Sequence, residues 1–174
     1  MLKIVLLTTA ALLGGCAGVD VSSYKDERPQ LRLEEYFNGT LDAWGMFQQR
    51  DGKVVKRFRV VIEARWEEES GILDERFIYS DGTIQQRIWT ITRNGADSYT
   101  GTAGDVVGVA SGRVSGNSLH WRYTLRLPVD SSVYEVQFDD WMYLQEDGVM
   151  INRSVMKKFG VRLGEVTLFF RKRS

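Results

Sequence analysis

The chain has 174 residues, the size of one ordinary domain. Hydrophobic residues make up 43% and aromatic residues 11%, which excludes an intrinsically disordered protein. The 23 Lys and Arg residues balance the 23 Asp and Glu residues, so we expect no nucleic-acid partner. The single cysteine excludes an internal disulfide.

The N-terminus has the pattern of an export signal. Lys3 precedes an apolar run from Ile4 to Leu13, which is too short for a transmembrane helix of about 20 residues. Leu13-Gly14-Gly15-Cys16 then resembles the lipobox of bacterial lipoproteins. That resemblance implies that residues 1–15 are a lipoprotein signal peptide and that Cys16 carries the lipid. The alternative is an ordinary signal peptide that happens to contain a cysteine.

The residue after the cysteine bears on localisation. Ala17, and not Asp, follows Cys16, and the usual sorting rule for such lipoproteins then implies the outer membrane, facing the periplasm. Residues 16–30 are polar and contain Pro29, so we expect a flexible, lipidated tether. The membrane partner would be contacted through this N-terminal lipid anchor, and residues 31–174 would form the domain.

Three Asp-Gly pairs predict hairpins along the domain. Asp51-Gly52, Asp81-Gly82 and Asp147-Gly148 are each flanked by runs in which apolar and polar residues alternate, as in half-buried antiparallel strands. We predict an all-β fold: an antiparallel meander of about eight to ten strands that closes into a lipocalin-like (calycin) up-and-down barrel. The predicted strands lie near residues 37–50, 53–67, 72–80, 83–93, 97–103, 107–115, 118–127, 133–146, 149–158 and 161–172.

Three stretches carry a resemblance to a known family. They are Tyr36-Phe37-Asn38-Gly39 with Trp44-Gly45, then Asp139-Asp140-Trp141-Met142-Tyr143, then Asn152-Arg153-Ser154 with Lys158-Phe159-Gly160. With these motifs the chain resembles the DUF3833 family of uncharacterised bacterial lipoproteins over nearly the whole mature sequence. The resemblance implies an envelope lipoprotein of unknown function and names no chemistry.

Hairpin register predicts which polar residues face the interior. A two-residue turn at Asp147-Gly148 places Asp140 and Arg153 as diagonal neighbours on the apolar face, where a buried ion pair is tolerated if it is hydrogen-bonded. The same argument at Asp81-Gly82 places Glu75 and Gln86 inside. An apolar interior with a few polar groups is typical of a small-molecule pocket. The candidate ligand-binding residues are Asp140, Arg153, Glu75, Gln86 and Tyr134.

Catalytic and cofactor motifs are not found. His120 is the only histidine and lies on the polar face of its strand, so we expect no zinc cluster, no metal site and no cofactor. No G-x-S-x-G elbow or phosphate-binding glycine loop is found, and we predict no enzymatic activity.

Three functional hypotheses remain open. In the first, a membrane-anchored barrel binds a lipid, a fatty-acid-like molecule or another small apolar ligand. In the second, the barrel is filled, and a structural or assembly lipoprotein acts through an unidentified protein partner docked on aromatic residues such as Trp89 and Trp141. In the third, an enzyme uses Glu75 or Asp140 as a base. Fold alone does not decide among them.

Overall fold

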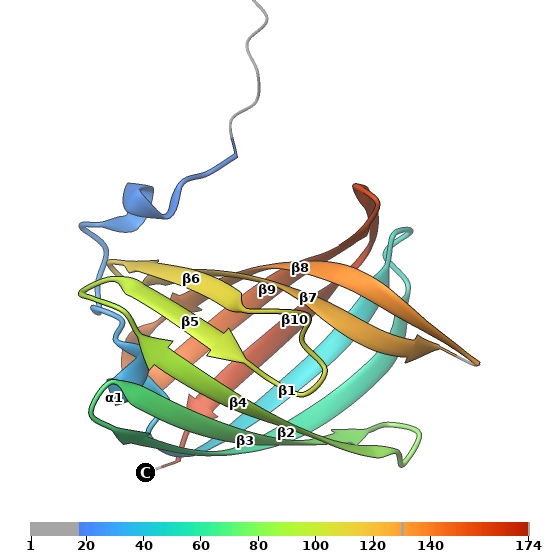
Figure 1. Cartoon of the computed structure of the whole chain (residues 1–174), viewed down its shortest axis with the longest axis horizontal. Helices are drawn as coiled ribbons and strands as arrows, with labels where there is room; N and C mark the ends of the chain where they lie inside the picture. Colours follow the sequence, from blue (N-terminus) through green and yellow to red (C-terminus); the bar gives the residue numbers. More distant parts are fainter. Residues whose placement is uncertain (1–17, 130, 174) are drawn as a thin grey trace, which may run out of the picture.

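The computed structural model describes residues 18–129 and 131–173, which form a closed barrel of ten antiparallel strands (Figure 1). A short helix α1 (Leu33–Tyr36) precedes the barrel, and 3-10 turns occupy η1 (Val21–Tyr24) and η2 (Glu146–Gly148). The strands are β1 Gly39–Gln49, β2 Val54–Glu67, β3 Ser70–Tyr79, β4 Ile84–Arg93, β5 Ser98–Thr102, β6 Ala110–Ser115, β7 Ser118–Val129, β8 Ser132–Leu144, β9 Val149–Lys158 and β10 Val161–Lys172.

The topology confirms the predicted meander. Each strand pairs with the next along the chain, and β10 returns to pair with β1, so no strand is left with a free edge. The expected signal peptide and Cys16 lie outside the described residues. Among the residues that are described, no helix is long and apolar enough to span a bilayer.

The helix α1 closes one end of the barrel. Leu33 is 1% exposed and, with Phe37, lines the floor of the interior, where the Phe37 ring packs edge-on against Phe170. Glu34 fixes the helix to the wall, because it accepts a 2.8 Å hydrogen bond from the Tyr99 hydroxyl and pairs with Arg93 at 3.3 Å. Access to the interior is therefore from the opposite end.

Residues 20–31 pack on the outside of the barrel, in contrast to the expected flexible tether. Val21 is buried, and the Tyr24 ring lies 5.9 Å from Trp141 and 5.5 Å from Tyr143, measured between ring centroids. The Leu31 amide donates to the carbonyl of Gly116 at 2.8 Å. Aromatic contacts of this kind outweigh the polar composition of the segment.

The contact at Gly116 gives a testable prediction. Gly116 has φ of +58°, and a Cβ there would lie 1.8 Å from the Tyr24 carbonyl oxygen. Gly116→Ala is expected to displace residues 20–31 and to lower the free energy of unfolding by about 1–3 kcal/mol. The measurement is hydrogen exchange of these residues together with urea unfolding. Gly82→Ala is the control, because Gly82 has φ of +86° with nothing within 4 Å of the added Cβ. Equal effects of both variants would show that backbone strain alone is responsible.

All three Asp-Gly hairpins have three-residue loops, and the two-residue loops assumed from the sequence are wrong. In each, the amide before the loop donates to the carbonyl after it: Gln49 to Lys53, Tyr79 to Thr83 and Gln145 to Val149. The glycine that ends each loop takes positive φ: Gly52, Gly82 and Gly148; in the third loop Asp147 also has a positive φ, of 56°.

The extra loop residue changes which side chains share a face. In β8–β9, Asp140 pairs with Ser154, and in β3–β4, Glu75 pairs with Arg87; both registers differ from the prediction by one residue. In β1–β2 a bulge after Phe47 cancels the shift, and the predicted pairing of Phe47 with Lys56 is correct. A one-residue shift moves a whole strand's side chains to the other face.

Candidate functional site

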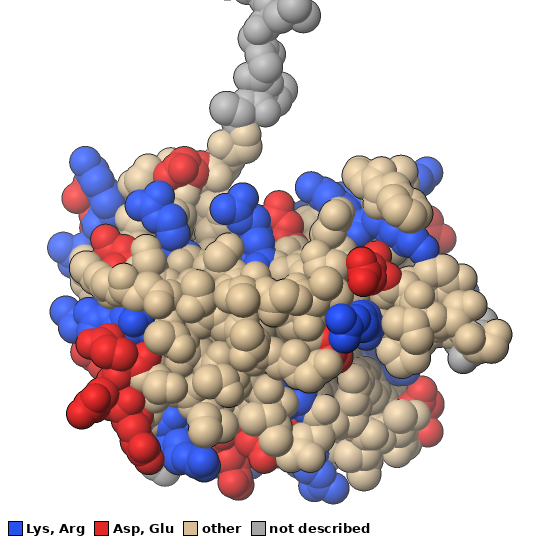
Figure 2. Space-filling view, viewed as in Figure 1, with Lys and Arg blue, Asp and Glu red and all other residues tan. Residues whose placement is uncertain are grey.

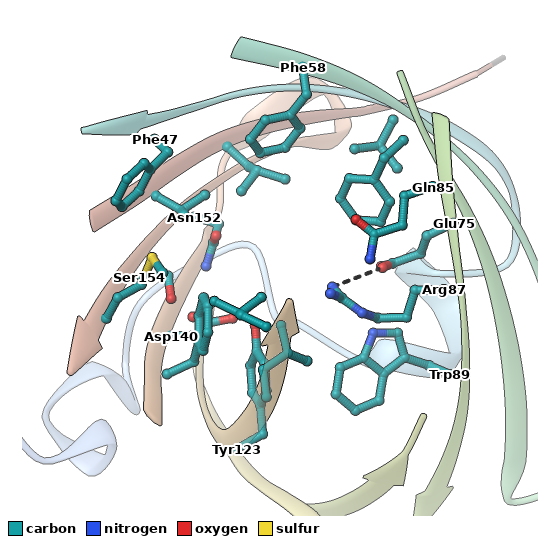
Figure 3. Close-up of a pocket in the computed structure, with 18 of the residues that line it drawn as sticks. Phe47, Phe58, Glu75, Gln85, Arg87, Trp89, Tyr123, Asp140, Asn152 and Ser154 are labelled. Carbon is teal, nitrogen blue, oxygen red and sulfur yellow. Dashed lines mark ion pairs between the residues drawn. The ribbon is translucent and has the colours of Figure 1, made fainter. Parts of the chain in front are cut away.

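A cavity of about 1000 Å³ occupies the barrel interior (Figure 3). Aromatic and aliphatic side chains form most of its walls, among them Phe47, Phe58, Leu125, Phe138, Val166 and Leu168. Its volume is within the range of small-molecule sites, which are largely apolar with few polar groups. The filled barrel of the second hypothesis is therefore not observed.

Bulky side chains line the closed half of this cavity. The Trp89 and Trp121 rings pack edge to face with centroids 5.9 Å apart, and both are buried. Trp89 was expected as an exposed docking residue, and this is wrong because alternation along β4 turns it inward.

A group of polar residues lies across the interior near the middle of their strands; we call it the polar belt. It consists of Glu75 on β3, Arg87 on β4, Tyr123 on β7, Asp140 on β8 and Ser154 on β9, and all line the cavity. Figure 3 shows Glu75 and Arg87 on one side and Asp140, Tyr123 and Ser154 on the other. The belt is the main polar feature between apolar walls.

Arg87 is held by two carboxylates. Its Nε and Nη2 atoms donate to Asp105, with Nη2 to Oδ2 at 2.8 Å, and its Nη1 lies 3.9 Å from Glu75 Oε2. Asp105 lies in the loop between β5 and β6. Only 13% of the Arg87 side chain is exposed, so its charge is compensated inside the protein, as a buried guanidinium requires.

Asp140 and Ser154 have unused hydrogen-bonding capacity. Asp140 is 5% exposed and Ser154 is 2% exposed, and neither Asp140 Oδ1 nor Ser154 Oγ has a hydrogen-bond partner. Burial raises the pKa of Asp140 to about 8, while the neighbouring Tyr123 hydroxyl and the Arg87 charge act to lower it. A buried polar atom without a partner is costly and is a natural contact for a bound polar group.

Glu75 is also shifted toward its neutral form. Burial raises the pKa of Glu75 to about 7, and the nearby Arg87 charge opposes this rise. Its side chain retains 15% exposure, which is exposure to the cavity. Near neutral pH each of the two interior carboxyls, Glu75 and Asp140, can therefore take up or release a proton.

The structure places two predicted site residues in the belt and a third at the mouth. Glu75 and Asp140 face the cavity as expected. Tyr134 lines the mouth, where the Lys158 ammonium lies 3.7 Å from its ring centroid. The residues that sequence reasoning missed are Arg87, Tyr123, Asp105 and Ser154 as polar groups of the site.

The inward positions predicted for Arg153 and Gln86 are wrong. Arg153 points outward and pairs with Glu165 at 3.0 Å, and its side chain is 62% exposed. Gln86 also points outward and donates to Asp74 at 2.8 Å. The three-residue loops cause both errors. One signal for Arg87 was available, since it shares the strand face of Trp89 and Ile91.

His120 lies outside the cavity. It stacks on Trp141 with ring centroids 4.1 Å apart, and its Nε2 is 2.6 Å from Asp139 Oδ1. Trp141 is thus partly covered by His120 and by Tyr24. Within residues 18–129 and 131–173, no group of His, Cys, Asp and Glu side chains is arranged to hold a metal ion.

Comparison with solved structures identifies the same architecture elsewhere. The chain is similar to the S-type phycobiliprotein lyase CPES from Guillardia theta, with a TM-score of 0.56 and 7% sequence identity, over 83% of this chain and 94% of that one. At this identity the likeness concerns the fold alone. No curated protein sequence matches the chain. The family model described as a protein of unknown function, DUF3833, matches residues 10–172, and the chain therefore belongs to the DUF3833 family.

Proposed function

We propose that this protein is a lipid-anchored protein of the bacterial envelope whose barrel binds a lipid or another small apolar molecule. The observation that carries the proposal is the cavity of about 1000 Å³ with apolar walls and a polar belt across it. Burial of an apolar molecule there would contribute about 25 cal/mol per Å² of apolar surface removed from water.

The depth of the belt favours one orientation of the ligand. On the closed side of the belt the cavity is lined by buried rings such as those of Trp89 and Trp121, and on the open side its walls are largely apolar up to the mouth. A molecule with one polar end would therefore enter with that end first, place it at the belt, and leave its apolar part toward the open end of the barrel. The opposite orientation would place the apolar end against Asp140 and Ser154, whose unpartnered oxygens would then stay unsatisfied.

The anchor rests on the sequence Leu13-Gly14-Gly15-Cys16. Two or three acyl chains on Cys16 would hold the protein stably at a membrane, whereas one would not. Intact-mass measurement of the chain extracted from bacterial membranes tests this: a mature protein that begins at Cys16 and carries acyl groups is expected. Release of the processed chain without acyl groups would contradict it.

Filling the cavity is expected to abolish ligand uptake. Leu168 lines the cavity, whereas the next residue, Phe169, is 42% exposed on the outer wall. Leu168→Trp should reduce binding of a fluorescent alkyl probe at least tenfold, because the larger ring occupies the space that the probe needs. Phe169→Trp is the matched control on the same strand and should bind as the parent does.

The experiment uses the lipidated full chain purified in detergent, with native mass spectrometry of co-purified lipid and probe titration. A parent protein that neither retains a lipid nor takes up a probe would contradict the proposal. So would equal binding by the two tryptophan variants, because the probe would then sit outside the cavity.

A second candidate is catalysis on the bound molecule. It is favoured by two cavity carboxyls, Asp140 and Glu75, whose pKa values are raised to about 8 and about 7, the range that a general base needs. The two candidates separate by product analysis. Recovery of the added molecule unchanged after long incubation supports binding alone, and a new product lost in Asp140→Asn supports catalysis.

A further inference from the structure

The polar belt contains more acidic than basic groups. Glu75, Asp140 and the adjoining Asp105 surround a single guanidinium, that of Arg87. The other cations that line the cavity, Lys56 and Lys158, lie at the mouth over the rings of Tyr79 and Tyr134. The middle of the cavity therefore disfavours a negatively charged group on the ligand.

Arg87 has little capacity left for a carboxylate ligand. Its Nε and Nη2 atoms are engaged by Asp105, at 2.9 Å and 2.8 Å to Oδ2, and its Nη1 lies 3.9 Å from Glu75 Oε2. A ligand carboxylate at Nη1 would lie beside Glu75, and one at Nε or Nη2 would have to displace Asp105. Breaking the buried, charge-assisted pair with Asp105 is costly.

The other side of the belt offers acceptors instead. Asp140 Oδ1 and Ser154 Oγ have no hydrogen-bond partner, both residues are at least nine-tenths buried, and they face each other across β8 and β9. We propose that the ligand's polar end is a protonated amine that donates to Asp140 and Ser154, and that the ligand is a cationic apolar molecule and not a fatty acid. This inference rests on the proposed binding function.

The charges around Asp140 determine how binding depends on pH. The groups that act on it are Tyr123 from β7, Arg87 from β4, Glu75 from β3 and the adjacent Asp139 on its own strand. An ammonium ion adds an attractive charge to this set, so binding should deprotonate Asp140 and release protons to solvent at neutral pH. Binding of the amine is then expected to strengthen as the pH rises from about 6 to about 8.

Three ligands with the same alkyl chain test the inference: dodecylamine, dodecanol and dodecanoate, titrated into the full chain at neutral pH. The expected order of affinity is amine, then alcohol, then carboxylate, with at least a tenfold difference between the first and the last. Asp140→Asn should reduce that difference several-fold, whereas Asp139→Asn, on the outer face beside His120, should preserve it.

The outcomes are distinguishable. Dodecanoate bound as tightly as the amine, whether in the belt or through Lys158 at the mouth, would overturn the inference and leave the binding function standing. An amine preference that persists unchanged in Asp140→Asn would also overturn it. Failure of all three ligands to bind would overturn the binding function itself.

An independent observation concerns the outside of the mouth. In the part of the chain that the structure describes, nine of the fifteen exposed large hydrophobic residues lie at the open end of the barrel. Phe159, between β9 and β10, is 90% exposed. The others are Val54, Val55, Ile84, Val129, Val133, Tyr134, Val161 and Leu163. Clustered exposure of this kind marks an interaction surface.

Basic residues accompany these apolar side chains. The β9–β10 hairpin carries Lys158 together with Lys157 and Arg162, which pair with Asp139 at 4.0 Å and Glu165 at 2.7 Å. The neighbouring β1–β2 hairpin carries Arg50 and Lys53. Figure 2 shows basic side chains flanking uncharged ones at the upper right, where Figure 1 places the ends of these two hairpins. In the same view the described N-terminal residues lie at the upper left, over the end of the barrel that α1 closes.

We propose that this mouth surface docks on a bilayer containing anionic lipids, with Phe159 inserted among the headgroups. Aromatic residues are favoured at the membrane interface, and each nearby Lys or Arg contributes about 1 kcal/mol of attraction to an anionic surface. The open end of the cavity would then face the lipid. The lipid anchor on Cys16, which the test below assumes, would keep this surface close to the bilayer.

A thiol probe tests the docking. Acylation consumes Cys16, so Val161→Cys provides one free thiol at the mouth, and Phe169→Cys provides a matched one on the outer wall. Each is labelled with an environment-sensitive dye in the lipidated full chain on vesicles. The dye at position 161 is expected to shift to shorter wavelength on phosphatidylglycerol-containing vesicles and to lose at least half of that shift when Phe159→Ser is added.

Three results would overturn the docking proposal. They are an aqueous spectrum at position 161 on anionic vesicles, an equal shift on phosphatidylcholine alone, and an equal shift at position 169. Absence of the chain from floated vesicles would instead overturn the lipid anchor. A concentration-dependent shift without vesicles would show that a second copy of the chain covers this surface, and would also overturn the proposal.

Discussion

Arg87→Met is expected to lower the free energy of unfolding by about 3–5 kcal/mol at neutral pH. The guanidinium compensates Asp105 at 2.8 Å and Glu75 at 3.9 Å, and only 13% of its side chain is exposed. Methionine has a similar length but no charge, so the variant leaves Asp105 without its partner in a poorly solvated place. Urea unfolding followed by circular dichroism measures the loss.

The matched control is Arg153→Met. Arg153 also pairs with a carboxylate, Glu165 at 3.0 Å, but its side chain is 62% exposed, so the loss should stay below about 1 kcal/mol. Adding Asp105→Asn to Arg87→Met should recover part of the stability, since the uncompensated charge is removed. Equal losses for the two arginine variants, or no recovery in the double variant, would contradict the role given to Arg87.

The strand order followed from the sequence because alternation and turn signals agree along most of the chain. On β7 the apolar face, with Leu119, Trp121 and Leu125, is distinct from the polar face, so one arrangement is clearly favoured. The number of residues in each turn was not determined in the same way. Asp-Gly suits both two-residue and three-residue loops, because either needs a glycine with positive φ.

That ambiguity explains which site residues were found. Asp140 and Glu75 were placed by the same register argument as Arg153 and Gln86, but each also shares a face with apolar residues of its own strand, so the wrong loop length did not move them and both face the cavity. Arg153 was assigned through the turn register, because β9 itself is ambiguous: Val149, Ile151 and Val155 lie on one face and Met150 and Met156 on the other. Where both faces of a strand carry apolar residues, only the partner strand decides the orientation.

The unsatisfied state of Asp140 is a long-range property that no local pattern contains. It arises because β7, β8 and β9 bring Tyr123, Asp140 and Ser154 together without enough donors for every oxygen. Such local conflicts are typical of functional sites, where stability is lost in favour of binding. Asp140 should therefore reveal itself in the pH dependence of folding.

Stability is expected to fall as the pH rises through neutrality, and Asp140→Asn should remove much of this fall. The pKa of Asp140 is raised from 3.8 to about 8 in the folded barrel. Between these values the folded state retains a proton that the unfolded chain has lost. The stabilisation is complete below the unfolded pKa and is lost as the pH rises toward about 8, by up to about 1.4 kcal/mol per pH unit for this group.

Glu75, with its pKa raised to about 7, adds to the slope in the lower part of the same window. Asparagine keeps the shape of Asp140 and cannot ionise, so Asp140→Asn should be less pH-dependent and more stable than the parent at about pH 9. Urea unfolding from about pH 5 to about pH 9 measures how the stability of the parent and of Asp140→Asn depends on pH. Asp139→Asn is the control and is compared with them between about pH 7 and about pH 9. A parent protein whose stability is constant or rises over this range would mean that Asp140 is already ionised in the folded barrel. Binding of the amine would then release no proton, but Asp140 would still accept its hydrogen bond.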